Sequence, residues 1–423
     1  MHILDIIAIL ITFSAVFSYF NYRYFHLPRT IGLMLSALIL SSGLIIAGQF
    51  GWDVKDQVLA IVRSIDFNRL LLNGILGFLL FAGALNVELN ELIIQKWVVF
   101  SLATAGVILS TIIVGGFAWV VFDTLKLPVP FMYCLLFGAL ISPTDPVAVI
   151  SILKTMQAPK SLETQMAGES LFNDGVGVVI FIVLLRIVDG GHDVSAQEAL
   201  LLFAKEAVGG IVLGLAAGYV TYQMLKRVDN YQVEILLTLG LVTGGYTGAT
   251  ALHTSGPLAI VAAGLMIGNH GRSFAMSETT RRNLDTFWEL IDEILNAILF
   301  ILIGMEVFAL EFSLKHLMAG ILIIPLVLLA RLISVGIPFS LLRIKNSYRA
   351  NTVRILTWGG LRGGIAVALA LSLPAGHARG VLLMMTYMVV VFSIAVQGLT
   401  IGRLVKRWKE TDVSVGDWGW WQH

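Results

Sequence analysis

The chain has 423 residues, of which 57% are hydrophobic and 13% are charged, with a net charge of +1 and a mean hydropathy of +0.87. A soluble domain carries about twice that charged fraction, so the composition predicts a polytopic membrane protein. No basic run with interleaved aromatic residues and no phosphate-binding glycine loop is present, which argues against nucleic acid as a partner, and the single cysteine, Cys134, excludes an intrachain disulfide and a cysteine-based metal site.

Membrane spans take up nearly the whole chain. Residues 1–21 are apolar but lack a basic leader region and a small-residue cleavage site, so we interpret them as a retained first span. About 20 mostly apolar residues cross a bilayer as a helix, and on this criterion we predict thirteen spans and no separate soluble domain. In chain order they cover residues 3–20, 31–48, 68–87, 97–121, 131–153, 165–188, 199–225, 232–250, 257–269, 286–310, 317–342, 351–373 and 380–404.

The basic residues predict an orientation. Of the 28 Lys and Arg residues, 18 fall in the gaps after odd-numbered spans or after the last span, and 8 fall in the other gaps. Because Lys and Arg accumulate on the cytoplasmic side, this bias predicts an outside N-terminus and a cytoplasmic C-terminus in the cell (inner) membrane. The basic stretch RLVKRWKE after the last span could rest on anionic headgroups, although plain anchoring is the simpler interpretation.

Two of the spans are interrupted. The fifth contains ISPTDPVAV, where Pro143 and Pro146 each remove a backbone donor, and the twelfth contains WGGLRGGIA, with four glycines around Arg362. These interruptions are seven spans apart, which is the offset expected if spans 1–6 and 8–13 are inverted repeats joined by the seventh. Paired interrupted helices at equivalent positions mark the midplane site of many transporters. Gly and Pro are also common in membrane helices generally, so the pattern alone leaves both interpretations open.

A polar stripe lies in the sixth span, within AGESLFNDGVG at residues 167–177. Glu169 and Asn173 are four residues apart, as are Ser170 and Asp174, so all four side chains share one helix face. A carboxylate inside the membrane is costly unless it faces a cavity, is paired or protonated, or binds a cation, so the stripe predicts a functional site. The alternative is a hydrogen-bonded cluster that only joins helices, against which the two acids count.

The interrupted fifth span adds further oxygen atoms. Asp145 lies between the two prolines and Thr144 precedes it, although Asp145 could instead cap the half-helix that follows. Carboxylate, hydroxyl and carbonyl oxygens are what a hard cation such as sodium accepts as ligands. We therefore predict a cation site between the fifth and sixth spans.

Two arginines lie inside predicted spans. Arg362 needs a negative partner at that depth, for which Glu169 is the first candidate and Asp145 the second. For Arg331 in the eleventh span, Glu306 is a plausible partner, unless either side chain reaches the membrane surface instead.

An acidic stripe stands near the start of the tenth span. It comprises Asp285, Glu289, Asp292 and Asn296, with Glu293 beside them. It is either an acidic vestibule that concentrates cations or an ordinary solvated first turn with acids at a helix N-terminus.

The motifs together resemble one family. SPTDPVAV, then GESLFNDGVGVV in the next span, then GGLRGGIAVALALSLP near the C-terminus resemble the NhaP/NHE-type monovalent cation:proton antiporters, in the right order over essentially the whole membrane domain. The resemblance implies an all-α polytopic membrane protein, with about thirteen transmembrane helices in two inverted six-helix repeats and crossed discontinuous helices 5 and 12. The repeats would cover about 3–190 and 230–405, linked by helix 199–225.

The resemblance also implies a homodimer and one antiporter membrane domain over 1–423. That domain would end in a short cytoplasmic tail, 406–423, where eukaryotic members carry a long regulatory one. The family's cation- and proton-binding positions fall on Asp174, Asn173, Ser170, Glu169, Thr144 and Asp145. Asp174 would be the essential carrier, with sodium held at Asp174, Ser170 and Thr144, and Arg362 matches the arginine that the family pairs with the glutamate equivalent to Glu169.

Competition for one carboxylate is enough for exchange. Burial disfavours the charged form of Asp174 and a bound cation favours it, so the side chain holds a proton or a sodium ion but not both. Either loaded state is nearly neutral and crosses as the repeats rock, whereas the empty, charged state is penalised by desolvation. With Asn at 173 in place of a second acid, we expect one proton per monovalent cation and therefore electroneutral exchange of sodium or lithium.

Other functions stay open as alternatives. A potassium/proton antiporter would use the same mechanism, and the motifs do not distinguish the two ions. A cation channel would need rings of carbonyls or charges, and an intramembrane enzyme would need a motif such as HExxH or GxSxG, neither of which occurs. We therefore expect no enzymatic activity and no cofactor beyond the transported ions.

Overall fold

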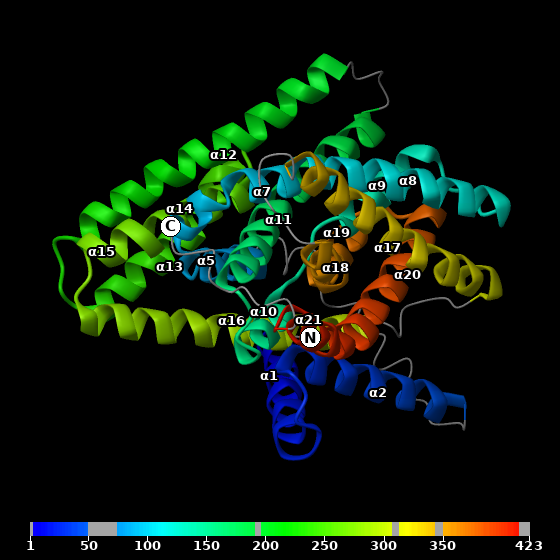
Figure 1. The fold of residues 1–423 in the computed structure, drawn as a ribbon, viewed down its shortest axis with the longest axis horizontal. Coiled ribbons are helices and arrows are strands. Elements are labelled where there is room, and N and C mark those ends of the chain that lie inside the picture. The colour runs from blue at the N-terminus through cyan, green and yellow to red at the C-terminus, as the bar shows by residue number, and fades with distance from the viewer. Residues whose placement is uncertain (1–2, 50–73, 191–195, 307–312, 343–349, 414–423) are drawn as a thin grey trace.

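The computed structural model describes residues 3–49, 74–190, 196–306, 313–342 and 350–413, and all regular secondary structure within these ranges is helical (Figure 1). This confirms the all-helical expectation for the described residues. Five of their helices are long and apolar enough to cross a membrane, and the bent pair of α18 and α19 would make a sixth. Several predicted spans correspond to shorter or interrupted helices, so the count of thirteen stays a prediction.

The first half of the chain contains both short and long helices. Residues 68–73 of the predicted third span lie outside the described residues, and α5 covers residues 76–85 of that span. The helices of this half are α1 (Ile3–Phe20), α2 (Arg29–Gln49), α5 (Leu76–Leu85), α6 (Leu89–Ile94), α7 (Lys96–Ser101), α8 (Val107–Thr124), α9 (Phe131–Ile141), α10 (Val147–Thr155) and α11 (Lys160–Gly190). A π-helical turn, η3 (Leu102–Gly106), joins α7 to α8.

The second half begins with α12, which lies along the outer edge of the molecule in Figure 1. Its helices are α12 (Ala196–Leu225), α13 (Tyr231–Ala251), α14 (Gly256–Met266), α15 (Arg272–Phe274), α16 (Glu278–Glu306), α17 (Leu314–Leu342), α18 (Ala350–Gly359), α19 (Gly364–Leu371), α20 (His377–Phe392) and α21 (Leu399–Val413). The turn η6 (Ser393–Gly398) joins α20 to α21, so the predicted tail begins as helix, and residues 414–423 lie outside the described ones.

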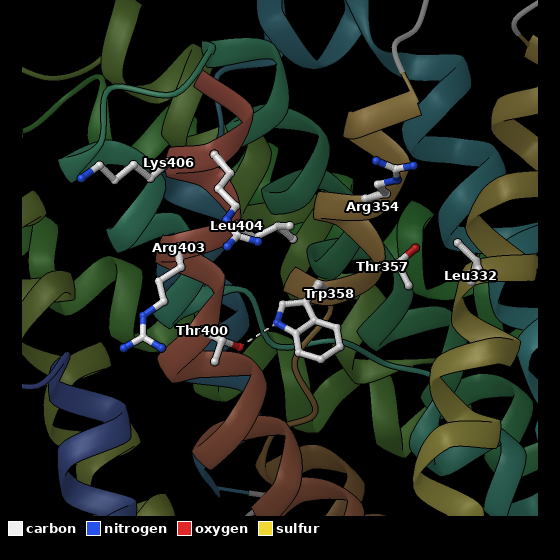
Figure 2. A pocket seen from close by; sticks show the side chains of 9 residues that line it. Leu332, Arg354, Thr357, Trp358, Thr400, Arg403, Leu404 and Lys406 are labelled. Atoms are coloured by element: carbon white, nitrogen blue, oxygen red, sulfur yellow. Dashed lines mark hydrogen bonds between the residues drawn. The ribbon is translucent and has the colours of Figure 1, made fainter. Parts of the chain in front are cut away.

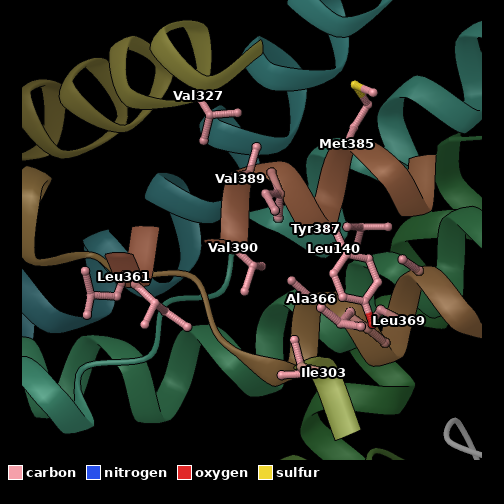
Figure 3. Close-up of a cluster of buried hydrophobic side chains, with 14 of the residues drawn as sticks. Leu140, Ile303, Val327, Leu361, Ala366, Leu369, Met385, Tyr387, Val389 and Val390 are labelled. Carbon is pink, nitrogen blue, oxygen red and sulfur yellow. The ribbon is translucent and has the colours of Figure 1, made fainter. Parts of the chain in front are cut away.

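The largest apolar core surrounds the two interrupted helices. Figure 3 shows Leu140 of α9, Ala366 and Leu369 of α19, and Tyr387 and Val390 of α20 gathered together, all of them buried. Dense packing of this kind fixes the helix ends on either side of each interruption, because a close-packed interior does not deform continuously. The core therefore holds both interruptions in place.

Close helix contact on one side of this core depends on a glycine. A Cβ atom at Gly138 of α9 would overlap the backbone of Thr111 in α8, so only glycine lets these helices approach so closely. Cys134, one turn earlier in α9, is fully buried and unpaired, as a small apolar residue would be.

Candidate functional site

The first interruption separates α9 from α10 at Ser142–Pro146. Helix α9 ends at Ile141 because Pro143 cannot donate the next backbone hydrogen bond, and α10 starts directly after Pro146. The last carbonyls of α9 therefore have no helical partner. The guanidinium of Arg362 lies just beyond them, since its Nη1 donates to the carbonyl oxygens of Ser142 and Pro143, the first two residues of the interruption.

The second interruption, between α18 and α19, lies directly against the first. The backbone N–H of Asp145 donates to the carbonyl of Leu361 at 2.8 Å, and the N–H of Arg362 donates to Ser393 Oγ of η6 at 2.9 Å. A Cβ atom at Gly363 would lie 2.6 Å from Asp145 Oδ2, so this glycine permits the close approach. The predicted interruptions are confirmed, and each supplies hydrogen-bond partners to the other.

The polar stripe of α11 faces the first interruption. Ser170 Oγ donates to the Thr144 carbonyl at 2.5 Å, and Asn173 Nδ2 donates to Thr144 Oγ1 at 2.9 Å. The backbone N–H of Thr144 donates in return to Asn173 Oδ1 at 3.3 Å. All three residues are buried. The structure thus brings Thr144 of span five together with Ser170 and Asn173 of span six. Both the oxygen and the nitrogen of the Asn173 amide are hydrogen-bonded.

Two acidic residues are direct neighbours of these residues in the chain, Asp145 after Thr144 and Asp174 after Asn173. Asp145 Oδ1 accepts a hydrogen bond from the Val147 N–H at 3.1 Å, as expected of an acid at the start of a half-helix. Asp174 is half-buried, and within the described residues its carboxylate has neither a hydrogen-bond donor nor an ion-pair partner. The two acids are close enough for the charge of Asp145 to act on Asp174. A cation is the partner this arrangement favours, because two neighbouring acids repel each other when both are charged.

The predicted ion pair between Arg362 and Glu169 is wrong. Glu169 pairs instead with Arg331 of α17, at 2.5 Å between Oε1 and Nη1, and both side chains are buried. Arg362 is held instead by the carbonyl oxygens of Ser142 and Pro143, directly after α9, where the C-terminal end of the helix carries partial negative charge. The two arginines therefore divide the available partners differently from the sequence-based expectation.

The other charged residues have mixed outcomes. The side chain of Glu306, proposed as the partner of Arg331, lies outside the described residues, and Arg331 is engaged by Glu169. In the acidic stripe of α16, Asp285 pairs with Arg272 and Glu289 is exposed, as in an ordinary solvated turn. Further along α16, Asp292 is half-buried and close enough to Asp145 for their charges to interact.

Sequence reasoning missed two contacts of the second interruption. Ser393 accepts the N–H of Arg362, and Gln397 Nε2 donates to the Trp358 carbonyl at 2.9 Å. A serine or a glutamine in a membrane span often only joins helices, so their positions carried no distinguishing signal. For Arg331, the sequence signalled only that its intramembrane charge required an acid, not that this acid was Glu169.

Comparisons with known proteins match nearly the whole chain. Residues 9–407 match the family model described as "Sodium/hydrogen exchanger, transmembrane". The chain is 50% identical over 411 residues to the Na(+)/H(+) antiporter NhaP of Pseudomonas aeruginosa, with 96% of each chain covered. It is 35% identical over 361 residues to the Na(+)/H(+) antiporter NhaH of Halobacillus dabanensis, covering 84% of this chain and 87% of that one.

A solved structure shows the same fold. The sodium proton antiporter MjNhaP1 from Methanocaldococcus jannaschii, at pH 8, superposes with a TM-score of 0.75 at 19% identity. The match covers 96% of this chain and 99% of that chain, so the likeness extends over the whole arrangement of helices.

Proposed function

The chain belongs to the sodium/hydrogen exchanger family, as its motifs predicted, and on this premise we propose that it is a sodium/proton antiporter. It exchanges a sodium or lithium ion for a proton at one carboxylate, that of Asp174. The names of its relatives support sodium and the proton as the two ions that are exchanged. As a member of a transporter family it is a multi-pass membrane protein rather than an enzyme.

One observation carries the proposal. The carboxylate of Asp174 has no cationic partner among the described residues and lies one helical turn after Ser170, whose Oγ donates to the Thr144 carbonyl at a helix interruption. Sodium takes oxygen ligands of these kinds, and the same carboxylate takes a proton when sodium is absent. Asp145 adds negative charge that attracts the cation, and Glu169 is neutralised by Arg331, which leaves Asp174 as the carrier.

Alternating access follows from a repeat architecture. In this proposal inverted repeats at about 3–190 and 230–405, linked by helix 199–225, cross at the two interrupted helices. The hydrogen bond from Asp145 to Leu361 supports such a crossing, since it joins one interruption to the other. Rocking of one part of the molecule against the other exposes Asp174 to each side in turn. The protein acts as a homodimer in the cell (inner) membrane, with a cytoplasmic C-terminus.

Exchange is electroneutral in this account. Asn173 stands beside Asp174 where a second acid would add another proton, and its amide is engaged by Thr144 on both its nitrogen and its oxygen. Asn173 neither binds nor releases a proton. One proton therefore leaves for each monovalent cation that enters.

The test is cation-driven proton movement in proteoliposomes that contain a pH-sensitive dye. We expect sodium and lithium to discharge an imposed pH gradient, at a rate unchanged by a potassium diffusion potential set with valinomycin. Potassium alone, tested without the ionophore, decides whether the ion is potassium instead. A rate that follows the membrane potential would overturn electroneutrality, and currents above any transporter's turnover would favour a channel.

A further inference from the structure

A large pocket lies between α17, α18 and α21, outside the proposed cation site. Its volume is about 810 Å³, within the range of small-molecule sites in proteins. Figure 2 shows the three helices around it, with Leu332 on α17, Trp358 on α18 and Thr400 on α21. None of Thr144, Ser170, Asn173 and Asp174 lines it, so exchange at Asp174 does not account for this pocket.

The pocket is strongly basic. Four cationic side chains line it and no acidic one does, the four being Arg354, Arg403, Lys406 and Arg407. All four are exposed, and Arg354, Arg403 and Lys406 have no ion-pair partner within the part of the chain that the structure describes. Like charges gathered without counter-charges repel one another, so an anion that meets them lowers the free energy of the folded protein.

Three of the other lining residues, Leu332, Trp358 and Leu404, are largely apolar, and the remaining two are Thr357 and Thr400. Leu332 is 43% exposed on α17, and Leu404 of α21 is half-buried. The indole of Trp358 is held in place because its Nε1 donates to Thr400 Oγ1 at 2.9 Å, as drawn in Figure 2. A hydrophilic anion such as inorganic phosphate would leave these apolar surfaces unused, whereas an amphipathic anion would cover them.

The pocket also lies at the right level for such a ligand. Its basic residues stand near the N-terminus of α18 and in α21, at and after the end of the last predicted span, on the side that the Lys and Arg bias predicts to be cytoplasmic. Anionic lipids give that surface its negative potential, and basic pockets between helices are suited to their headgroups.

We propose that this pocket binds an anionic phospholipid, with the headgroup at the basic residues between α18 and α21 and an acyl chain along Leu332 and Leu404. The bound lipid links α18 to α21. Helix α18 leads directly into the interruption that carries Arg362, and Gln397 of η6 already holds the Trp358 carbonyl, so the lipid braces the segment next to the cation site. The proposal does not depend on the exchange mechanism.

The test is titration of the full-length, delipidated protein in detergent with phosphatidylglycerol and with phosphatidylcholine. Bound lipid is counted by native mass spectrometry, and the shift in melting temperature is recorded. The variant Arg354→Gln/Arg403→Gln/Lys406→Gln is compared with Lys226→Gln/Arg227→Gln/Arg282→Gln, which removes three exposed charges elsewhere on the predicted cytoplasmic side.

We expect phosphatidylglycerol to bind wild type and the control variant alike and to raise their melting temperatures. The pocket variant should bind it at least tenfold more weakly, because each basic residue removed costs about fivefold near an anionic surface. The single variant Arg354→Gln, in case the triple variant does not fold, should lose about fivefold. Phosphatidylcholine should give no specific binding to any of them.

Two results would overturn the proposal. One is equal affinity of the pocket and control variants for phosphatidylglycerol, which would mean that basic residues attract the lipid wherever they lie. The other is displacement of the lipid by millimolar inorganic phosphate, with the same stabilisation from phosphate alone, which would make the pocket a site for a soluble anion.

Discussion

Asp174→Asn is expected to reduce sodium-driven proton movement to the level of protein-free liposomes. The variant keeps the size and the hydrogen-bonding capacity of the side chain but removes its charge and its proton. A cation at this depth would then lack its balancing charge, which costs about 3 kcal/mol or more, equivalent to a loss of over 100-fold. The measurement is the dye response to sodium at equal protein content in the vesicles.

The matched control for this variant is Asp123→Asn at the exposed end of α8. It makes the same chemical change outside the site and should exchange sodium as wild type does. If Asp174→Asn also exchanges sodium as fast as wild type, the polar stripe of α11 only joins helices and the carrier assignment is wrong.

Glu169→Gln is expected to destabilise the protein more than any other isosteric single substitution at the site. It leaves Arg331 buried with its charge uncompensated, and breaking a buried ion pair in this way costs about 3–5 kcal/mol. The measurement is the melting temperature of the purified protein in detergent. The double variant Glu169→Gln/Arg331→Gln should recover much of the loss, because no unpaired charge remains.

A double-mutant cycle identifies the partner of Glu169. Coupling between positions 169 and 331 should exceed about 1 kcal/mol, as for residues in direct contact, and coupling between 169 and 362 should be smaller. A larger coupling between positions 169 and 362 would support the pair of Arg362 and Glu169 that the sequence suggested. Equal melting temperatures of Glu169→Gln and wild type would show that the pair contributes nothing to stability.

The site could be predicted from sequence where the signal was local. Two prolines within four residues each remove a backbone donor, which located the interruption at Ser142–Pro146. The spacing of four residues placed Ser170 and Asp174 on one helix face, and intramembrane acids are rare enough to mark that face as functional. Contact between Thr144 and Asn173 followed because both lie where adjacent spans carry polar groups.

Pairing between distant helices could not be predicted in the same way. Arg362 was expected to need an acidic side chain, but the backbone carbonyls of Ser142 and Pro143 satisfy it, and residue types do not reveal such partners. Arg331 of α17 and Glu169 of α11 meet through the arrangement of helices far apart in the sequence, which no spacing encodes. The basic pocket could not be predicted for the same reason, since it forms only where Arg354 of α18 and Arg403 of α21 are brought together by helix packing.

Proton release on sodium binding is the measurement that tests competition at Asp174 most directly. Sodium is added to concentrated, weakly buffered protein in detergent at a pH where Asp174 is protonated, and the released protons are counted with an indicator dye. Competition at Asp174 predicts that one proton is released for each sodium ion bound by wild type, and that none is released from Asp174→Asn. Sodium binding to wild type without proton release, or equal release from both proteins, would contradict exchange by competition at this carboxylate.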